Sequence, residues 1–153
     1  MKKGKIVLVG AGFVGMSMAY SMLNRGGINE LVLVDLNKDK TIGEEMDLSH
    51  GLPYAPQKMV IKAGDYSDCK DAQIVVITAG VPQAPKDRMS DLEKANEIVV
   101  DISNRLRETS FKGIILVASN PMEVITELIA HYTDYPYNKV IGTGTMLDTA
   151  RLK

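Results

Sequence analysis

The sequence has little of what marks secreted, membrane-spanning or nucleic-acid-binding chains. A single cysteine, Cys69, excludes an internal disulfide framework and fits a reducing compartment. The net charge of -1 provides no basic field for nucleic acid or anionic lipid. No apolar run approaches membrane-spanning length, and the run after the basic N-terminal residues is too short for a signal-peptide core. We therefore expect a cytoplasmic protein that binds neither nucleic acid nor membrane.

The apolar pattern alternates between strands and helices along a chain of 153 residues, which is enough for one domain with a buried core. Apolar runs predict strands at residues 5–9, 31–34, 58–63, 74–78, 114–117 and 140–141. Helical patterns cover residues 13–25, 38–50 and 91–109. The first helix is apolar on nearly every face, so we expect it to be buried all round. This order predicts an α/β fold: a Rossmann doubly wound, six-stranded parallel sheet with helices on both faces.

Three glycines follow the first predicted strand at G-x-G-x-x-G spacing, namely Gly10, Gly12 and Gly15. Gly10 permits a sharp turn, Gly12 lets the backbone approach a pyrophosphate, and Gly15 lets the next helix lie close to its strand. The N-terminus of that helix would face the phosphates with unpaired N–H groups. The motif alone is a weak signal, because glycine-rich turns occur in many loops.

Asp35 stands at the end of the second predicted strand, about twenty residues after the glycine motif. A carboxylate at this place accepts the hydroxyls of an adenosine ribose and repels a 2′-phosphate. The alternative is that Asp35 is an ordinary turn residue at the end of a strand. Together with the three glycines, Asp35 predicts that the chain binds NAD rather than NADP.

Two further candidates follow the later strands, where ligands bind in such sheets. Residues 78–88 form a loop longer than a tight turn needs, and Arg88 near its end can swing over a substrate. A solvated arginine on a loop is the alternative for Arg88. Asn120 follows the fifth strand, but helix capping explains it equally well, because Pro121 and Glu123 complete a helix-start pattern.

Asp148 and Arg151 lie three residues apart, so on a helix they share one face. The carboxylate can orient a catalytic base, and the guanidinium can grip a substrate carboxylate with two hydrogen bonds. The alternative is a surface ion pair of little energetic weight. We expect no metal site.

Five motifs, in order along the chain, resemble those of the L-lactate dehydrogenase family within the larger lactate and malate dehydrogenase group. They are residues 10–15, 46–51, 77–83, 119–121 and 142–151. The resemblance implies hydride transfer between NADH and pyruvate, or L-lactate and NAD, by a cytoplasmic homotetramer in glycolysis and fermentation. It also implies that residues 1–143 are the NAD-binding domain and residues 144–153 the start of a helix leading into a substrate domain. That domain and its catalytic histidine are absent from the chain, so we expect the chain alone to be inactive.

The resemblance also implies roles for individual residues. The cofactor contacts would be Gly10, Gly12, Val14, Gly15, Asp35, Lys40, Tyr66, Gly80, Val81, Ser119, Asn120 and Thr143. Arg88 would polarise the substrate carbonyl, with Met89 as a rival for the arginine position because the loop looks one residue short. Asp148 would orient the catalytic histidine.

The substrate itself would be a small 2-oxo or 2-hydroxy acid. Gln83 stands where malate dehydrogenases usually place an arginine, which implies an uncharged substrate tail. Asn120 would hydrogen-bond the substrate oxygen and Arg151 would fix the substrate carboxylate. Three alternatives stay open: a related L-2-hydroxyacid dehydrogenase such as a 2-hydroxyisocaproate-like enzyme, a malate dehydrogenase, or a stand-alone NAD-binding regulatory module.

Overall fold

The protein is built on a six-stranded sheet in which every neighbouring pair of strands is parallel. A computed structural model describes residues 4–80 and 88–153, with backbone alone for residues 88–92. The strands lie in the order β3-β2-β1-β4-β5-β6. Their bounds are β1 Lys5–Val9, β2 Glu30–Val34, β3 Val60–Ala63, β4 Ile74–Ile77, β5 Ile114–Val117 and β6 Val140–Gly142. The doubly wound sheet predicted from the sequence is confirmed.

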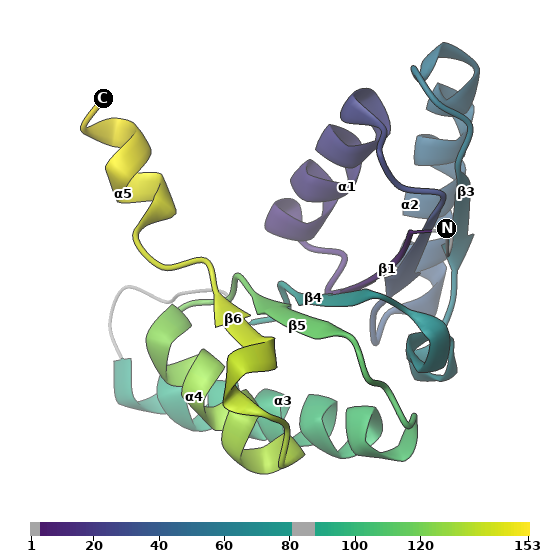
Figure 1. Ribbon diagram of the computed structural model, residues 1–153. Helices are drawn as coiled ribbons and strands as arrows, with labels where there is room; N and C mark the ends of the chain where they lie inside the picture. The colour runs from purple at the N-terminus through teal and green to yellow at the C-terminus, as the bar shows by residue number, and fades with distance from the viewer. Residues whose placement is uncertain (1–3, 81–87) are drawn as a thin grey trace.

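Helices cover both faces of this sheet (Figure 1). α1 (Phe13–Arg25) and α2 (Lys38–Gly51) lie on one face, and α3 (Arg88–Glu108) and α4 (Met122–Thr133) lie on the other. The short helix α5 (Met146–Arg151) projects away from the sheet at the C-terminus and has no buried residue. The other elements of the described residues are the 3-10 turns η1 Leu52–Tyr54, η2 Tyr66–Asp71 and η3 Tyr137–Lys139.

Side-chain alternation along the strands divides the apolar core into two layers. Ile6 and Leu8 of β1 join Ala19 and Leu23 of α1 in one layer. Val7, the residue between them, points to the opposite face and packs in the layer covered by α3 and α4. Because strands buried on both faces need apolar residues at every position, this explains the continuous apolar runs of the sequence.

Helix α1 corrects one expectation, because it is buried along a single stripe rather than all round. Gly15, Ala19 and Leu23 face the sheet, while Phe13 is 98% and Tyr20 is 61% exposed. Small residues in this stripe let the helix approach the strands closely, and three partly buried methionines of the helix pack against the same core layer, namely Met16, Met18 and Met22. Apolar composition alone therefore overestimated the burial of this helix.

Helix α4 corrects a second expectation. Its N-cap residue is Pro121 and makes no side-chain capping hydrogen bond, so Asn120 does not cap the helix as the sequence pattern predicted. The peptide bond between Asn120 and Pro121 is cis. The remaining elements agree with the predicted ones to within a few residues, with α3 beginning at Arg88 rather than Asp91. Within the described ranges, no helix is long and apolar enough to cross a membrane.

Candidate functional site

The glycine turn between β1 and α1 is packed tightly against the end of β4. Gly10 has φ of +105°, and its N–H donates to the Val34 carbonyl at 2.8 Å. The hydroxyl of Thr78 donates to the Gly10 carbonyl at 2.8 Å. A Cβ at Gly10 would overlap the backbone of Ala79, and a Cβ at Gly15 would overlap the Gly10 carbonyl. The predicted roles of Gly10 in the turn and of Gly15 in helix packing are therefore confirmed.

Gly12 is different, because a Cβ at this position would meet no atom of the described residues within 4 Å. Packing inside the chain thus gives no reason for a glycine here. Gly12 is the N-cap of α1, with no side-chain capping bond and no acidic residue in the first helical turn. The first N–H groups of an α-helix have no partner within the helix, so this end is suited to an anion. The open approach fits a diphosphate.

Asp35 lies beside this turn and helps to hold it. One carboxylate oxygen accepts the Ala11 N–H at 2.7 Å, and the other accepts the Asn37 N–H at 3.0 Å. A carboxylate has about four lone-pair positions, so both oxygens retain capacity to accept ribose hydroxyls. Asp35 thus also acts as a turn residue at the end of its strand, which was the alternative considered from the sequence. Sequence reasoning missed the bond from Ala11, which links residues 24 positions apart.

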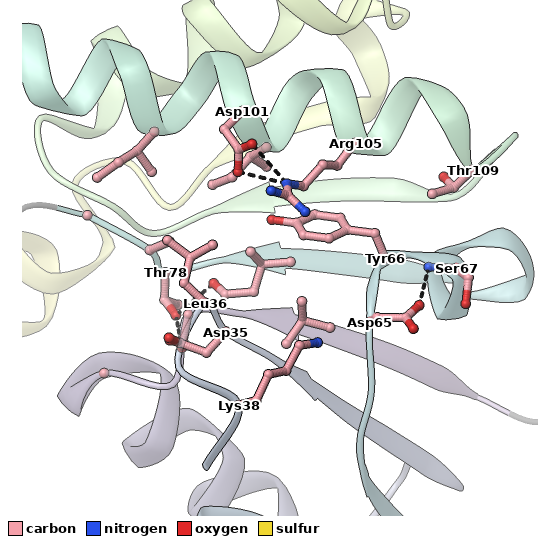
Figure 2. Close-up of a pocket in the computed structure, with 18 of the residues that line it drawn as sticks. Asp35, Leu36, Lys38, Asp65, Tyr66, Ser67, Thr78, Asp101, Arg105 and Thr109 are labelled. Atoms are coloured by element: carbon pink, nitrogen blue, oxygen red, sulfur yellow. Dashed lines mark hydrogen bonds and ion pairs between the residues drawn. The ribbon is translucent and has the colours of Figure 1, made fainter. Parts of the chain in front are cut away.

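A cavity of about 1120 Å³ opens at the carboxyl ends of the strands, next to the glycine turn and Asp35 (Figure 2). Its size suits a dinucleotide, since ligand pockets commonly measure about 300–1,000 Å³. It is lined by six residues of the predicted cofactor set: Gly10, Gly12, Asp35, Lys40, Tyr66 and Gly80. These residues come from four segments of the chain, which the parallel topology brings to one edge.

The other predicted cofactor residues lie around this cavity or outside the described residues. Val14 is 57% exposed on α1. Ser119 is buried, and its hydroxyl donates to the Ala79 carbonyl at 2.6 Å, which ties the end of β5 to that of β4. Thr143 borders a separate hollow beside α5. Val81 lies outside the described residues.

The predicted substrate residues are not gathered into one site. Gln83 lies outside the described residues, and Arg88 and Met89 are described by their helical backbone alone. Asn120 is exposed at the end of β5. On α5, Arg151 Nη1 and Asp148 Oδ1 lie 3.4 Å apart, and the two side chains are 69% and 68% exposed. This geometry is that of the surface ion pair considered above.

Several polar residues at the cavity were not singled out by sequence reasoning, among them Thr78, Asp101 and Arg105. The Arg105 Nε donates to both Asp101 oxygens, at 2.9 and 2.8 Å. The Arg105 guanidinium carbon lies 5.6 Å from the centre of the Tyr66 ring. Burial raises the pKa of Tyr66, and the charge of Asp101 raises it further against the opposing charge of Arg105. The only available signal was the four-residue spacing of Asp101 and Arg105, which is common on helix surfaces.

The arrangement can bind a nucleotide, but its described lining lacks histidine, the side chain that most often transfers protons in catalysis. His50 and His131 lie on α2 and α4 and are exposed. The residues present fit NAD in three respects: an open glycine at a helix N-terminus, a carboxylate for the ribose, and sufficient volume.

Comparison with known proteins agrees with this geometry. The family described as lactate/malate dehydrogenase, NAD binding domain, matches residues 4–142. The L-lactate dehydrogenase of Macrococcus caseolyticus is 46% identical over 99% of this chain and 49% of its own length. L-lactate dehydrogenase 2 of Bacillus cereus is 47% identical over all of this chain and 50% of its own length. The chain thus spans about half the length of the curated relatives that it matches.

Solved structures give the same result. A lactate dehydrogenase enzyme from a Medee basin deep-sea metagenome library is 51% identical, with a TM-score of 0.94 over 99% of this chain and 49% of its own. The minor L-lactate dehydrogenase from Enterococcus mundtii in its ligands-bound form is 40% identical, with a TM-score of 0.93 over 97% of this chain and 48% of its own.

Proposed function

Because the chain belongs to the lactate/malate dehydrogenase family, in which it is the NAD-binding domain, we propose that it binds NAD in the cavity beside the glycine turn. Gly12 and the N-terminus of α1 would hold the diphosphate, and Asp35 would accept the hydroxyls of the adenosine ribose. The observation that carries this proposal is the open backbone at Gly12 beside a carboxylate with acceptor capacity to spare.

The proposed activity of the whole protein is that of an L-lactate dehydrogenase, the name given to both curated relatives described above. NAD, when bound, supplies the hydride acceptor, and NADH the donor. Arg88 then polarises the carbonyl of a 2-oxo acid, and Asp148 orients the general acid or base. Arg151 holds the substrate carboxylate, with its guanidinium suited to two parallel hydrogen bonds.

Asn120 and Gln83 complete the proposed substrate contacts. Asn120 hydrogen-bonds the substrate oxygen, and the structure of α4 is compatible with this, since the helix does not use Asn120 as its cap. Gln83 contacts the substrate tail, and its uncharged amide favours pyruvate over a dicarboxylate. The remaining predicted cofactor contacts, at Val14, Val81, Ser119 and Thr143, belong to the same proposal, as does the domain limit at residue 143.

A related L-2-hydroxyacid dehydrogenase is the second candidate, because an uncharged Gln83 excludes a charged tail better than it fixes the tail's size. A longer protein that carries this chain can be assayed for its relative rates on pyruvate, a branched 2-oxo acid and oxaloacetate. These rates distinguish a lactate dehydrogenase from a related L-2-hydroxyacid dehydrogenase and from a malate dehydrogenase. Pyruvate as the best substrate supports the first proposal. A preference for the branched acid or for oxaloacetate identifies the alternatives.

Assembly, location and pathway complete the proposal for the whole protein. We propose a cytoplasmic homotetramer in fermentation and glycolysis that has neither nucleic acid nor membrane as a partner. The near-zero net charge offers no basic field for nucleic acid or anionic lipid and so supports the last part of this proposal. Sedimentation of a longer protein that carries this chain tests the tetramer.

Cofactor preference tests the NAD proposal directly. We expect the chain to bind NADH at least about ten-fold more tightly than NADPH, because the Asp35 carboxylate repels a 2′-phosphate. Asp35→Ser narrows this ratio, since Lys38 and Lys40 also line the cavity and attract the phosphate. Fluorescence titration with both reduced cofactors measures the ratio.

Asp39→Ser is the matched control, because Asp39 is an exposed carboxylate on α2 that is absent from the described lining of the cavity. It removes the same charge and should leave the ratio unchanged. Thermal unfolding verifies that each variant is folded. If a folded wild-type chain takes up no NADH, or if Asp35→Ser leaves the cofactor ratio as it was, the proposal is wrong.

A further inference from the structure

The cavity extends past Asp35 into a part that the cofactor motif does not cover. In a dinucleotide the base and the diphosphate leave the ribose from different carbons. If the diphosphate lies at the glycine turn and the ribose at Asp35, the adenine extends onward from Asp35. The cavity lining includes the apolar side chains of Leu36, Ile98 and Ile102, together with Tyr66 and Arg105.

Tyr66 and Arg105 meet across this space from different elements. Tyr66 is the first residue of η2, and its ring projects toward α3, as Figure 2 shows. Arg105 reaches from α3 to lie 5.6 Å from the ring centre, while its Nε is held by both oxygens of Asp101. The three side chains thus form a chain of contacts from α3 to η2, which we name the Tyr66 clamp (Asp101, Arg105 and Tyr66).

We propose that Arg105 is a positioning residue for the adenine of the cofactor, acting through Tyr66. The guanidinium covers the ring and fixes its plane, and Asp101 fixes the guanidinium. The ring then presents a preformed wall to a planar base. This inference deepens the proposed function and rests on it.

The ring of Tyr66 packs partly against the core, but the exposure of Asp101 and Arg105 argues that this pair of the clamp contributes more to binding than to folding. Arg105 and Asp101 have side chains that are 47% and 45% exposed, in an i, i+4 pair on one helix. Pairs of this kind contribute little to stability, because solvent screens the charges. A preformed wall still improves binding, because an ordered ring loses less conformational freedom when a ligand docks against it.

ADP-ribose is the probe, because it carries the adenine, ribose and diphosphate without the nicotinamide. We expect Arg105→Met to weaken its binding by about two- to five-fold, the value of a partly exposed cation–π contact. Arg105→Lys keeps a cation near the ring but loses the planar guanidinium, so its affinity should lie between those of the wild type and Arg105→Met. Isothermal titration calorimetry measures all the variants.

Arg107→Met is the matched control. Arg107 lies two residues further along α3, is exposed, and is absent from the described lining of the cavity. It removes the same charge from the same helix and should bind ADP-ribose as the wild type does. Equal losses in the two methionine variants would assign the effect to net charge and overturn the positioning role.

A double-mutant cycle with Tyr66→Leu tests whether Arg105 acts through the ring. In the Tyr66→Leu background, Arg105→Met should change the ADP-ribose affinity by less than about two-fold, because coupled residues give non-additive effects. An equal loss in both backgrounds would contradict the proposal, as would an unchanged affinity of Arg105→Met in the wild-type background. If the folded wild-type chain does not bind ADP-ribose at all, it is the proposed function that fails.

Discussion

The glycines of the turn differ in their physical roles. At the scale of single residues, a glycine that the fold needs can therefore be told from one that a ligand would need. Gly15 faces the Gly10 carbonyl and the Thr78 hydroxyl, so it has no room for a side chain. Gly12 has room in the described structure, and its φ of -83° is accessible to alanine. Packing within the described residues therefore gives no reason for a glycine here, whereas the proposed diphosphate does.

Alanine substitutions test this separation. Gly12→Ala should lower the free energy of unfolding by no more than about 1 kcal/mol, the usual effect of a change at a helix N-cap. It should weaken NADH binding by at least about ten-fold, because the Cβ occupies the approach to the diphosphate. Gly15→Ala should lower the free energy of unfolding by about 1–3 kcal/mol, because its Cβ overlaps fixed backbone. Urea unfolding and NADH titration measure the two effects.

Gly43→Ala is the control, since a Cβ at this exposed position on α2 meets no described atom within 4 Å. It lies outside the described lining of the cavity and should bind NADH normally. If Gly12→Ala also binds NADH normally, the diphosphate does not lie over this turn.

Spacing along the chain predicted residues whose roles are local, but it did not predict contacts that depend on the fold. The glycines and Asp35 stand in one short pattern, so their chemistry was readable. The Thr78 hydroxyl bonds a carbonyl 68 residues away, and the Ser119 hydroxyl bonds one 40 residues away. Such partners are fixed by the order of strands in the sheet, which spacing along the chain does not reveal. Arg105 was missed for the same reason, because its contact with Tyr66 joins α3 to η2.

At the scale of elements, η2 is held by an ionic network at the side of the sheet. Lys5 is buried at the start of β1 and lies 2.6 Å from Asp71 and 3.6 Å from Asp68. Asp68 also accepts a bond from Lys62 of β3 at 2.6 Å and one from the Asp65 N–H at 3.2 Å. The network therefore ties η2, which carries Tyr66 into the cavity, to two strands.

Asp68 should be the important carboxylate of this network. Its side chain is 12% exposed, while that of Asp71 is 74% exposed. Asp68→Asn should lower the free energy of unfolding by about 1–3 kcal/mol, because it removes a charge partner of the buried Lys5. Asp71→Asn is the matched control and should have a smaller effect, since solvent screens an exposed pair. Urea unfolding at neutral pH compares the two, and an equal effect would contradict this account.

The same residue predicts a dependence on pH. Burial raises the pKa of Asp68, but the hydrogen bonds from Lys62 and Asp65 and the charges of Lys62 and Lys5 outweigh it, so the net pKa lies below 3.8. The unfolded chain therefore binds this proton more readily than the folded one. The stabilisation by Asp68 is complete above the unfolded pKa and is lost as pH falls through the folded pKa. Asp68→Asn should reduce the loss of stability between pH values of about 7 and 3.

The predicted bounds of helices and strands were most accurate where the apolar periodicity is strong. They were least accurate where several residues could each begin a helix. Strand β5 and helix α1 have the predicted bounds, because apolar runs and glycine stops mark them clearly. The prediction that α1 is buried all round was wrong, because composition does not say which apolar side chains fit against a sheet. The predicted cap at Asn120 was wrong because the helix begins one residue later than the pattern suggests, with Pro121 as its N-cap.

At the scale of the whole molecule, the cavity proposed to bind the cofactor differs from the residues proposed to hold the substrate in how firmly the fold supports it. The cavity that fits the cofactor is formed within the described residues. The proposed substrate residues Asp148 and Arg151 stand on α5, which has no buried residue and projects from the sheet in Figure 1. Positions that grip a reacting molecule must be held firmly, and an exposed six-residue helix provides no such support.

The chain of 153 residues should therefore bind NADH without oxidising it. Reduction of a 2-oxo acid needs a proton for the new hydroxyl, delivered by a group within hydrogen-bond reach. Its two histidines, His50 and His131, are exposed on α2 and α4 and lie outside the described lining of the cavity. On adding pyruvate to a mixture of NADH and this chain, we expect the nicotinamide absorbance to stay constant while the fluorescence titration still reports binding. A steady loss of absorbance in proportion to the amount of chain would contradict this, because a side chain of this chain other than an exposed histidine would then be delivering the proton.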